Sequence, residues 1–164
     1  DASWTNCPGY ACVVQTADCL PVLLCDQVSG CIAAVHVGWR GLISNILDNT
    51  INSMPISRSN LIAWLGPRIG FSAFEIDVPV YKVISNWVVS KGGLAKDFTS
   101  PHPHVPNKYL ANLAKLASHA LRYAGLSNIY DVGTCSFSDS KRFFSHRRDA
   151  GKTGRMATVI ALTV

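Results

Sequence analysis

Two residues near the start of the chain have the chemistry of metal ligands. Cys19 closes the segment Thr16 to Cys19, and His36 opens the segment His36 to Gly41. Each stands beside a short apolar run that predicts a strand, so neighbouring strands could bring a thiolate and an imidazole together. Both groups bind zinc, and a catalytic zinc takes three protein ligands and keeps one position open for water or substrate. The spacing indicates two ligands of such a site, although it also suits a core thiol and a hydrogen-bonded histidine.

The same pair also has the chemistry of a nucleophile and its base. An imidazole beside a cysteine can hold it as the reactive thiolate. Asp18 is placed to orient His36 or to accept a proton, so we predict a catalytic role for it. A metal-free cysteine hydrolase using Cys19 and His36 is therefore an alternative to the zinc site.

Arginines near these segments predict an anion-binding site. Arg40 lies at the expected start of a helix, where a cation opposes the helix dipole, and a bound anion would explain its presence there. We therefore predict that Arg40 binds substrate and contributes to catalysis. In the basic segment 141–155, two phenylalanines should anchor a loop whose side chains suit phosphate oxygens. The predicted phosphate ligands of this loop are Ser145, Arg147 and Arg148.

The basic segment also allows interpretations in which it has no catalytic role. Its cations are Lys141, Arg142, Arg147, Arg148, Lys152 and Arg155. They could form a solvated edge or a noncatalytic phosphate- or RNA-binding module. We favour a small phosphate pocket over a nucleic-acid groove because the charge is concentrated locally. Trp39 suits core packing or stacking on a base, and Glu75 suits a surface position or an acid–base role.

The composition fits one globular domain. With 164 residues, 48% of them hydrophobic, the chain can bury an ordinary core. Several of the six cysteines lie in strand-like apolar runs, which predicts buried free thiols rather than disulfides. Every apolar run is interrupted by Asp, Arg, Gly or Pro, so we expect no membrane span and a cytoplasmic protein.

The expected elements alternate between strands and helices. Apolar runs rich in Val and Ile predict strands, and apolar residues at helical spacing predict helices. The expected strands are 11–15, 21–25, 30–37, 61–65, 128–132 and 156–164. The expected helices are 42–51, 78–89 and 107–123, with an irregular loop at 90–106 and a turn at 136–141. This mixture predicts an α/β or α+β sandwich of mixed sheet and helices.

Six ordered motifs resemble those of the YfiH family, also called laccase-domain or multicopper polyphenol oxidase domain proteins. They are Thr16 to Val22, Ala34 to Gly41, Ala63 to Pro67, Phe74-Glu75, Phe143 to Ser145 and Gly154 to Ala157. The resemblance covers essentially the whole chain. It implies a single catalytic domain over residues 1–164, with the fold of YfiH proteins and of the catalytic domain of cytotoxic necrotizing factors.

The resemblance implies a zinc bound by two histidines and one cysteine. Cys19 and His36 match the cysteine and the second histidine. The first histidine belongs to a Gln-Val-His-Gly motif upstream of the segment that matches Asp1, so we expect this domain to lack its N-terminal portion. His146 stands where the family usually has tyrosine, which bears on substrate preference and offers a possible replacement ligand.

The family resemblance also implies an activity. It is that of a purine nucleoside phosphorylase acting on adenosine, inosine or methylthioadenosine, with adenosine deaminase activity. Its partners would be a purine nucleoside and phosphate rather than nucleic acid or a membrane. A copper-dependent polyphenol oxidase, or laccase, is a further alternative, but laccases need many histidines. This chain has five, and its one His-X-His pair, His102 and His104, is distant from Cys19 in sequence, so we expect zinc rather than copper.

Overall fold

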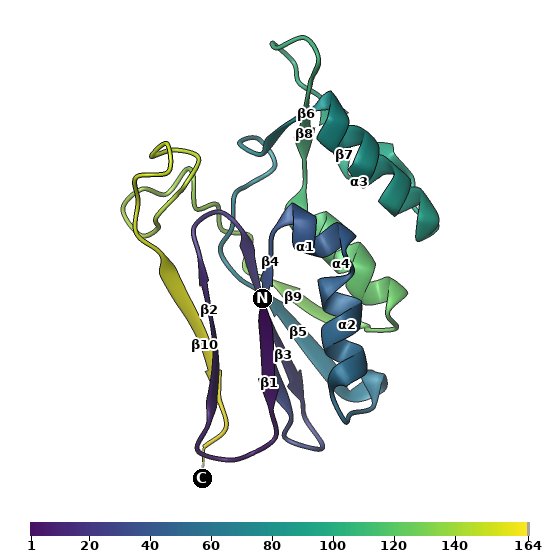
Figure 1. Cartoon of the computed structure of the whole chain (residues 1–164), viewed down its shortest axis with the longest axis vertical. Helices are drawn as coiled ribbons and strands as arrows, with labels where there is room; N and C mark the ends of the chain where they lie inside the picture. Colours follow the sequence, from purple (N-terminus) through teal and green to yellow (C-terminus); the bar gives the residue numbers. More distant parts are fainter. Residues whose placement is uncertain (164) are drawn as a thin grey trace.

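The computed structural model describes residues 1–163, and a five-stranded mixed sheet lies at its centre (Figure 1). The strand order is β1-β4-β3-β5-β9, with antiparallel pairing throughout except between β5 and β9, which are parallel. These strands are β1 (Ala2–Thr5), β3 (Leu20–Asp26), β4 (Ile32–Val37), β5 (Leu61–Leu65) and β9 (Asn128–Asp131). The interior strands β3 and β4 are largely buried, which explains their continuous apolar sequence.

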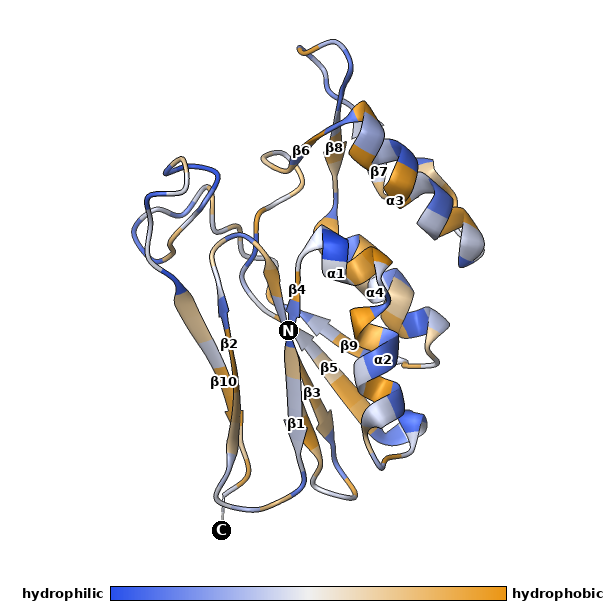
Figure 2. Cartoon of the chain, viewed as in Figure 1, coloured by the Kyte–Doolittle hydropathy of each residue, from blue (hydrophilic) through white to orange (hydrophobic). Residues whose placement is uncertain are grey.

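Helices cover one face of this sheet and a two-stranded ribbon lies on the other side (Figure 1). The helices are α1 (Trp39–Ile43), α2 (Ile46–Ser53) and α4 (Leu113–Tyr123), and the ribbon pairs β2 (Ala11–Thr16) with β10 (Met156–Ala161). The main core lies between sheet and helices, where apolar residues follow β3, β5 and the covering helices in Figure 2. A second, smaller core holds Cys12 and Val14 of the ribbon against Ile32 and Ala34 of the sheet.

A small third sheet stands beyond one end of the main sheet. It has the order β6-β8-β7, with β6 (Glu75–Asp77), β7 (Thr99–Pro101) and β8 (Lys108–Ala111), and it carries α3 (Val78–Ser90). Short 3-10 turns occur at Arg58–Asn60 and Ala95–Asp97. Asp77 begins α3 by accepting a 3.0 Å hydrogen bond from the Val80 amide, with Pro79 in the first turn.

The mixed α/β fold predicted from the sequence is confirmed, but several element boundaries are wrong. The expected helix 107–123 begins only at Leu113, because Lys108–Ala111 pair between β6 and β7 as β8. Asn112 then caps α4 by accepting a 3.0 Å hydrogen bond from the Lys115 amide. The expected helix 42–51 is divided at Asn45, whose φ of 58° lies in the left-handed region, and the expected loop 90–106 contains β7.

The remaining expectations concern the ends of the chain, its thiols and its helices. The last strand stops at Ala161 rather than continuing to 164, and Val164 lies outside the described residues. All six cysteines are free, as predicted, although Cys7 is exposed rather than buried. Within residues 1–163, no helix combines the length and the apolar character that crossing a bilayer requires.

Candidate active site

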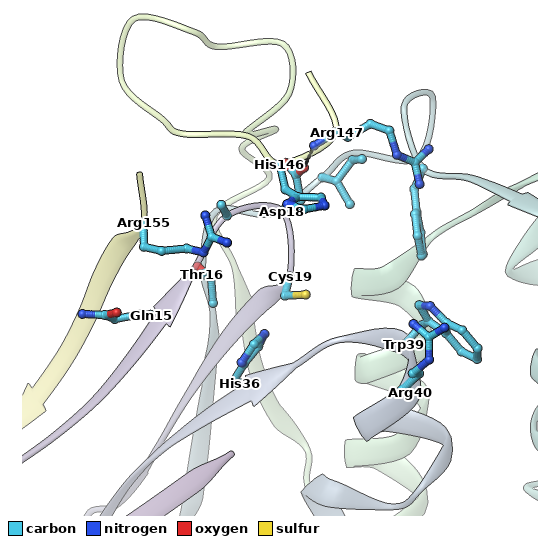
Figure 3. Close-up of a pocket in the computed structure, with 13 residues that line it drawn as sticks. Gln15, Thr16, Asp18, Cys19, His36, Trp39, Arg40, His146, Arg147 and Arg155 are labelled. Carbon is cyan, nitrogen blue, oxygen red and sulfur yellow. Dashed lines mark hydrogen bonds between the residues drawn. The ribbon is translucent and has the colours of Figure 1, made fainter. Parts of the chain in front are cut away.

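Cys19 and His36 contribute side chains to one pocket at the end of the main sheet (Figure 3). Cys19 immediately precedes β3, and His36 lies in β4 opposite Pro21, with Leu20 opposite Val37. Leu20 and Val37 point into the main core and are fully buried, so the alternation of side chains turns Cys19 and His36 away from the core. The register of two adjacent strands therefore brings the thiol and the imidazole to the same cavity.

This cavity, called here the central pocket, has a volume of about 420 Å³. It is lined by Gln15, Thr16, Ala17, Asp18, Cys19, His36, Trp39, Arg40, Ile69, Phe74, His146, Arg147 and Arg155. Its wall comes from the ends of β2 and β4, the start of α1, and the loop that leads to β10. A thiol, imidazoles, aromatic rings and three guanidinium groups thus surround one space of a size suited to a small ligand.

The protonation of the pair suits metal binding better than metal-free nucleophilic catalysis. Burial raises the pKa of the Cys19 thiol and the neighbouring Asp18 carboxylate adds to this, while Arg155 acts in the opposite direction. Burial lowers the pKa of His36. The lowered pKa of His36 favours the neutral imidazole, which is the form that binds a metal, and the raised pKa of Cys19 disfavours the free thiolate that a metal-free nucleophile needs.

A sulfur and a neutral imidazole nitrogen are donors that zinc accepts. Binding a cation would also compensate for the raised pKa of Cys19, because a coordinating thiol is deprotonated by the metal. The part of the chain that the structure describes contains no group of three or more His, Cys, Asp or Glu side chains placed to hold one ion. Cys19 and His36 thus fit a zinc site as two of its ligands.

Asp18 organises the rim of the pocket rather than orienting His36. Its carboxylate, 8% exposed, accepts hydrogen bonds from Ser136 Oγ at 2.7 Å, Ser145 Oγ at 3.0 Å and the Arg147 amide at 2.6 Å. Its φ of 83° is in the left-handed region. No hydrogen bond joins Asp18 to His36 among residues 1–163, so the predicted orientation of the histidine by Asp18 is not what the structure shows.

Two of the predicted phosphate ligands, Arg40 and Arg147, line the central pocket. Arg40 lies over the Trp39 ring, with its guanidinium carbon 4.4 Å from the ring centroid. The Arg147 guanidinium donates to the carbonyls of Ala73 at 3.4 Å and Glu75 at 3.1 Å, which fixes its position. Both side chains are largely exposed, so they can meet a ligand that enters from solvent.

The structure does not bring the other two predicted phosphate ligands into the pocket. Ser145 is fully buried, and its hydroxyl donates to Asp18. The Arg148 guanidinium donates to the carbonyls of Ser136 at 2.9 Å and Phe143 at 3.0 Å and pairs with Asp149 at 2.8 Å. Ser145 and Arg148 therefore hold the loop together, because unpaired loop carbonyls and a buried carboxylate need donors.

Arg155 and Phe74 reach the pocket without having been predicted as site residues. The sequence identified Arg155 only as one cation of the basic segment. Its position at the pocket follows from the pairing of β10 with β2, in which the next residue, Met156, lies opposite Thr16. His146 also lines the pocket and is exposed. The rest of the basic segment, Lys141, Arg142, Arg148 and Lys152, borders a separate cavity.

Fold and pocket together define an α/β domain whose site suits an anionic ligand beside a thiol and an imidazole. The chain belongs to the family described as multi-copper polyphenol oxidoreductase laccase, whose model matches residues 1–163. It is 39% identical over 162 residues to the purine nucleoside phosphorylase of Pseudomonas aeruginosa, covering 99% of this chain and 64% of that protein. It is also 39% identical over 164 residues to the purine nucleoside phosphorylase YfiH of Escherichia coli K12, covering 99% and 63%.

Solved structures agree with this assignment. A Neisseria meningitidis protein described by the family name DUF152 superposes with a TM-score of 0.91 and 38% identity, covering 100% of this chain and 65% of that one. The YfiH protein of Bacillus licheniformis gives a TM-score of 0.90 at 28% identity, covering 99% and 61%. The resemblance to YfiH proteins predicted from the sequence is confirmed, and the chain spans a little under two-thirds of the length of these relatives.

Proposed function

We propose that this domain belongs to a zinc-dependent purine nucleoside phosphorylase that acts on adenosine, inosine or methylthioadenosine and also deaminates adenosine. The observation that supports this most is that one pocket joins Cys19 and His36 to three arginines, Arg40, Arg147 and Arg155. The names of the relatives in Pseudomonas and Escherichia point to the same activity.

In this proposal each part of the pocket has a separate task. Cys19 and His36 hold the zinc, which when bound supplies a Lewis acid and lowers the pKa of a coordinated water. The guanidinium groups of Arg40, Arg147 and Arg155 bind phosphate and neutralise its charge. Phosphorolysis joins a phosphate oxygen to C1′ of the ribose and breaks the C1′–N9 bond, and the electron pair of that bond leaves with the base.

The pocket walls and rim support this chemistry by positioning. Trp39 and Phe74 offer apolar faces on which a base or sugar can pack. Asp18 fixes Arg147 through the backbone amide, so the arginine is already placed before substrate arrives. His102 and His104, the pair that a copper oxidase would use, are not among the residues that line this pocket.

The test uses the intact protein and the variants Cys19→Ala and His36→Ala, with Cys25→Ala as a matched control. Cys25 lies in β3 and does not line the central pocket. We expect both site variants to lose bound zinc, measured by elemental mass spectrometry, together with phosphate-dependent release of adenine from adenosine. The control should retain both, and circular dichroism should show that all variants are folded.

Two results would contradict the zinc mechanism. Nucleoside turnover that persists in zinc-free Cys19→Ala protein would exclude a metal-dependent reaction. Loss of turnover in Cys19→Ala with zinc fully retained would instead identify Cys19 as a nucleophile, as in a cysteine hydrolase. Ammonia release from adenosine, measured in the same samples, tests the deaminase activity separately.

A further inference from the structure

A second cavity opens beside the central pocket and shares part of its wall. This side pocket has a volume of about 380 Å³. Trp39, Arg40, Phe74 and Arg147 line both cavities. The side pocket is completed by Glu75, Ile76, Asp77, Val80 and Lys108. The two cavities are therefore adjoining compartments, separated by two aromatic rings and two arginines.

The compartments differ in the charge that they present. Arg40 and Arg147 border both compartments, with Arg155 added in the central pocket and Lys108 in the side pocket. The carboxylate of the central pocket, Asp18, already accepts three hydrogen bonds, whereas the side pocket adds the carboxylates of Glu75 and Asp77. The Asp77 carboxylate already accepts a hydrogen bond from the Val80 amide, which caps the first turn of α3. Glu75 is thus the acidic group that the side pocket offers to a ligand, and its side chain is 33% exposed.

Glu75 is held in place by donors from the small third sheet and its loop. Its Oε1 lies 3.3 Å from Lys108 Nζ, and its Oε2 lies 3.7 Å from His102 Nε2. The other ring nitrogen of His102 accepts from the amides of His104 and Val105, so Nε2 is the nitrogen that carries a proton toward Glu75. A carboxylate has about four lone-pair sites, and these two neighbours leave others open to the pocket.

The surroundings of Glu75 favour a neutral donor as its ligand. Lys108 already compensates the negative charge, so a second cation would gain less than a hydroxyl group that needs only an acceptor. Two adjacent hydroxyls of a ribose match the two oxygens of one carboxylate, and an acidic side chain binds ribose hydroxyls in the same manner in dinucleotide sites. We propose that the side pocket binds the ribose of the substrate, with Glu75 accepting hydrogen bonds from its 2′- and 3′-hydroxyls.

This inference rests on the proposed phosphorylase function and extends it. The phosphate and the ribose must meet at C1′, and the adjoining compartments place an anion site directly beside a hydroxyl site. Arg147 links them physically, because its guanidinium donates to the backbone carbonyl of Glu75 while its own amide is held by Asp18. Arg147 therefore connects Glu75, the proposed ribose ligand, to the loop that carries the proposed phosphate ligand.

The test compares adenosine with 2′-deoxyadenosine in the intact protein, in Glu75→Gln and in Asp97→Asn. The amide keeps the shape of Glu75, and Asp97 is an exposed acidic residue outside both pockets. We expect the wild type to prefer adenosine in kcat/KM, and Glu75→Gln to reduce that preference by about tenfold or more, the size of one lost charged hydrogen bond. The kcat/KM for 2′-deoxyadenosine, which keeps only the 3′-hydroxyl, should fall less than that for adenosine, and Asp97→Asn should behave like the wild type.

Direct binding of both nucleosides, measured by equilibrium dialysis, separates this inference from the function on which it rests. Equal turnover of the two nucleosides by the wild type would overturn the role of Glu75 and leave the phosphorylase intact. An unchanged preference in folded Glu75→Gln protein would do the same. If the wild type neither binds nor converts either nucleoside, both the ribose site and the proposed function are wrong.

Discussion

The Asp18 carboxylate accepts a 2.6 Å hydrogen bond from the backbone amide of Arg147, which is 129 positions further along the chain. The same carboxylate accepts from Ser136 and Ser145, so one buried acid connects the turn after β2 to three residues of the segment before β10. This connection fixes the backbone of Arg147 in the loop that lines the central pocket together with Cys19 and His36. Its strength therefore governs both the stability of the loop and the geometry of the site.

Asp18→Asn should destabilise the protein by about 2 to 4 kcal/mol, because an amide group replaces one acceptor oxygen facing three donors. Asparagine tolerates the positive φ of this position, so backbone strain does not explain the loss. Chemical denaturation measures the effect. The control Asp139→Asn breaks an exposed ion pair with Arg142 and should cost clearly less. Equal losses in the two variants would contradict the organising role of Asp18.

Gly38→Ala should weaken zinc binding without unfolding the domain. A Cβ at Gly38 would lie 3.2 Å from Cys19 Sγ, so the thiol must move, while the backbone φ of −83° and ψ of 164° suit alanine. We expect the zinc affinity of the intact protein, measured by competition with a chelator, to fall by about tenfold or more. In the control Gly41→Ala the new Cβ would only make an ordinary 3.6 Å contact with Ile46. Unchanged affinity in Gly38→Ala would argue against Cys19 as a ligand.

Arg40→Ala should weaken phosphate binding and Arg148→Ala should lower stability, although the sequence predicted phosphate binding for both residues. Arg40 lies over Trp39 at the central pocket, so its loss should raise the KM for phosphate about tenfold and leave the thermal midpoint nearly unchanged. Arg148 donates to three loop carbonyls and pairs with Asp149, so its loss should lower the thermal midpoint. A large phosphate effect in Arg148→Ala with unchanged stability would show that Arg148 does bind substrate.

Asp26 should make the domain sensitive to acid. A hydrogen bond from the Ser29 hydroxyl, and then one from the Val28 amide, lower the pKa of this carboxyl below its ordinary value of 3.8, against the effect of burial. A carboxyl whose pKa is lower in the folded state stabilises the fold above its unfolded pKa, and this contribution is lost as the pH falls through the folded pKa. Asp26→Asn should therefore cost about 1 to 2 kcal/mol at neutral pH.

The measurement for Asp26 is the difference in free energy of unfolding between wild type and Asp26→Asn across the pH range. This difference should be constant at neutral pH and should shrink below the ordinary carboxyl pKa of 3.8. A difference that stays constant into strong acid would mean that the charge of Asp26 contributes nothing. Ser29→Ala should reproduce part of the loss, since it removes the shorter of the two hydrogen bonds, 2.6 Å against 2.9 Å.

The sequence by itself predicted the strands that carry the candidate site, and it singled out Cys19 and His36, which line one pocket in the structure. The runs of β3 and β4 are almost entirely apolar, so their burial follows from composition, and Cys19 and His36 stand near their ends. The helix predicted from the spacing of apolar residues was wrong where a short strand directly precedes a helix. Leu110 continues the apolar stripe of α4, yet it pairs with Glu75 in a sheet, because a partner strand distant in sequence satisfies its backbone groups.

Only the tertiary structure decided which basic residues face the pocket. Arg147 and Arg148 are neighbours of the same type, and nothing local distinguishes them. In the folded chain Arg148 meets carbonyls of its own loop, whereas Arg147 is turned toward β6 and the pocket by the hydrogen bond from its amide to Asp18. Arg155 reaches the pocket because β10 pairs with β2 in one particular register. The placements of Arg147 and Arg155 depend on contacts between segments more than 70 residues apart, which no local pattern encodes.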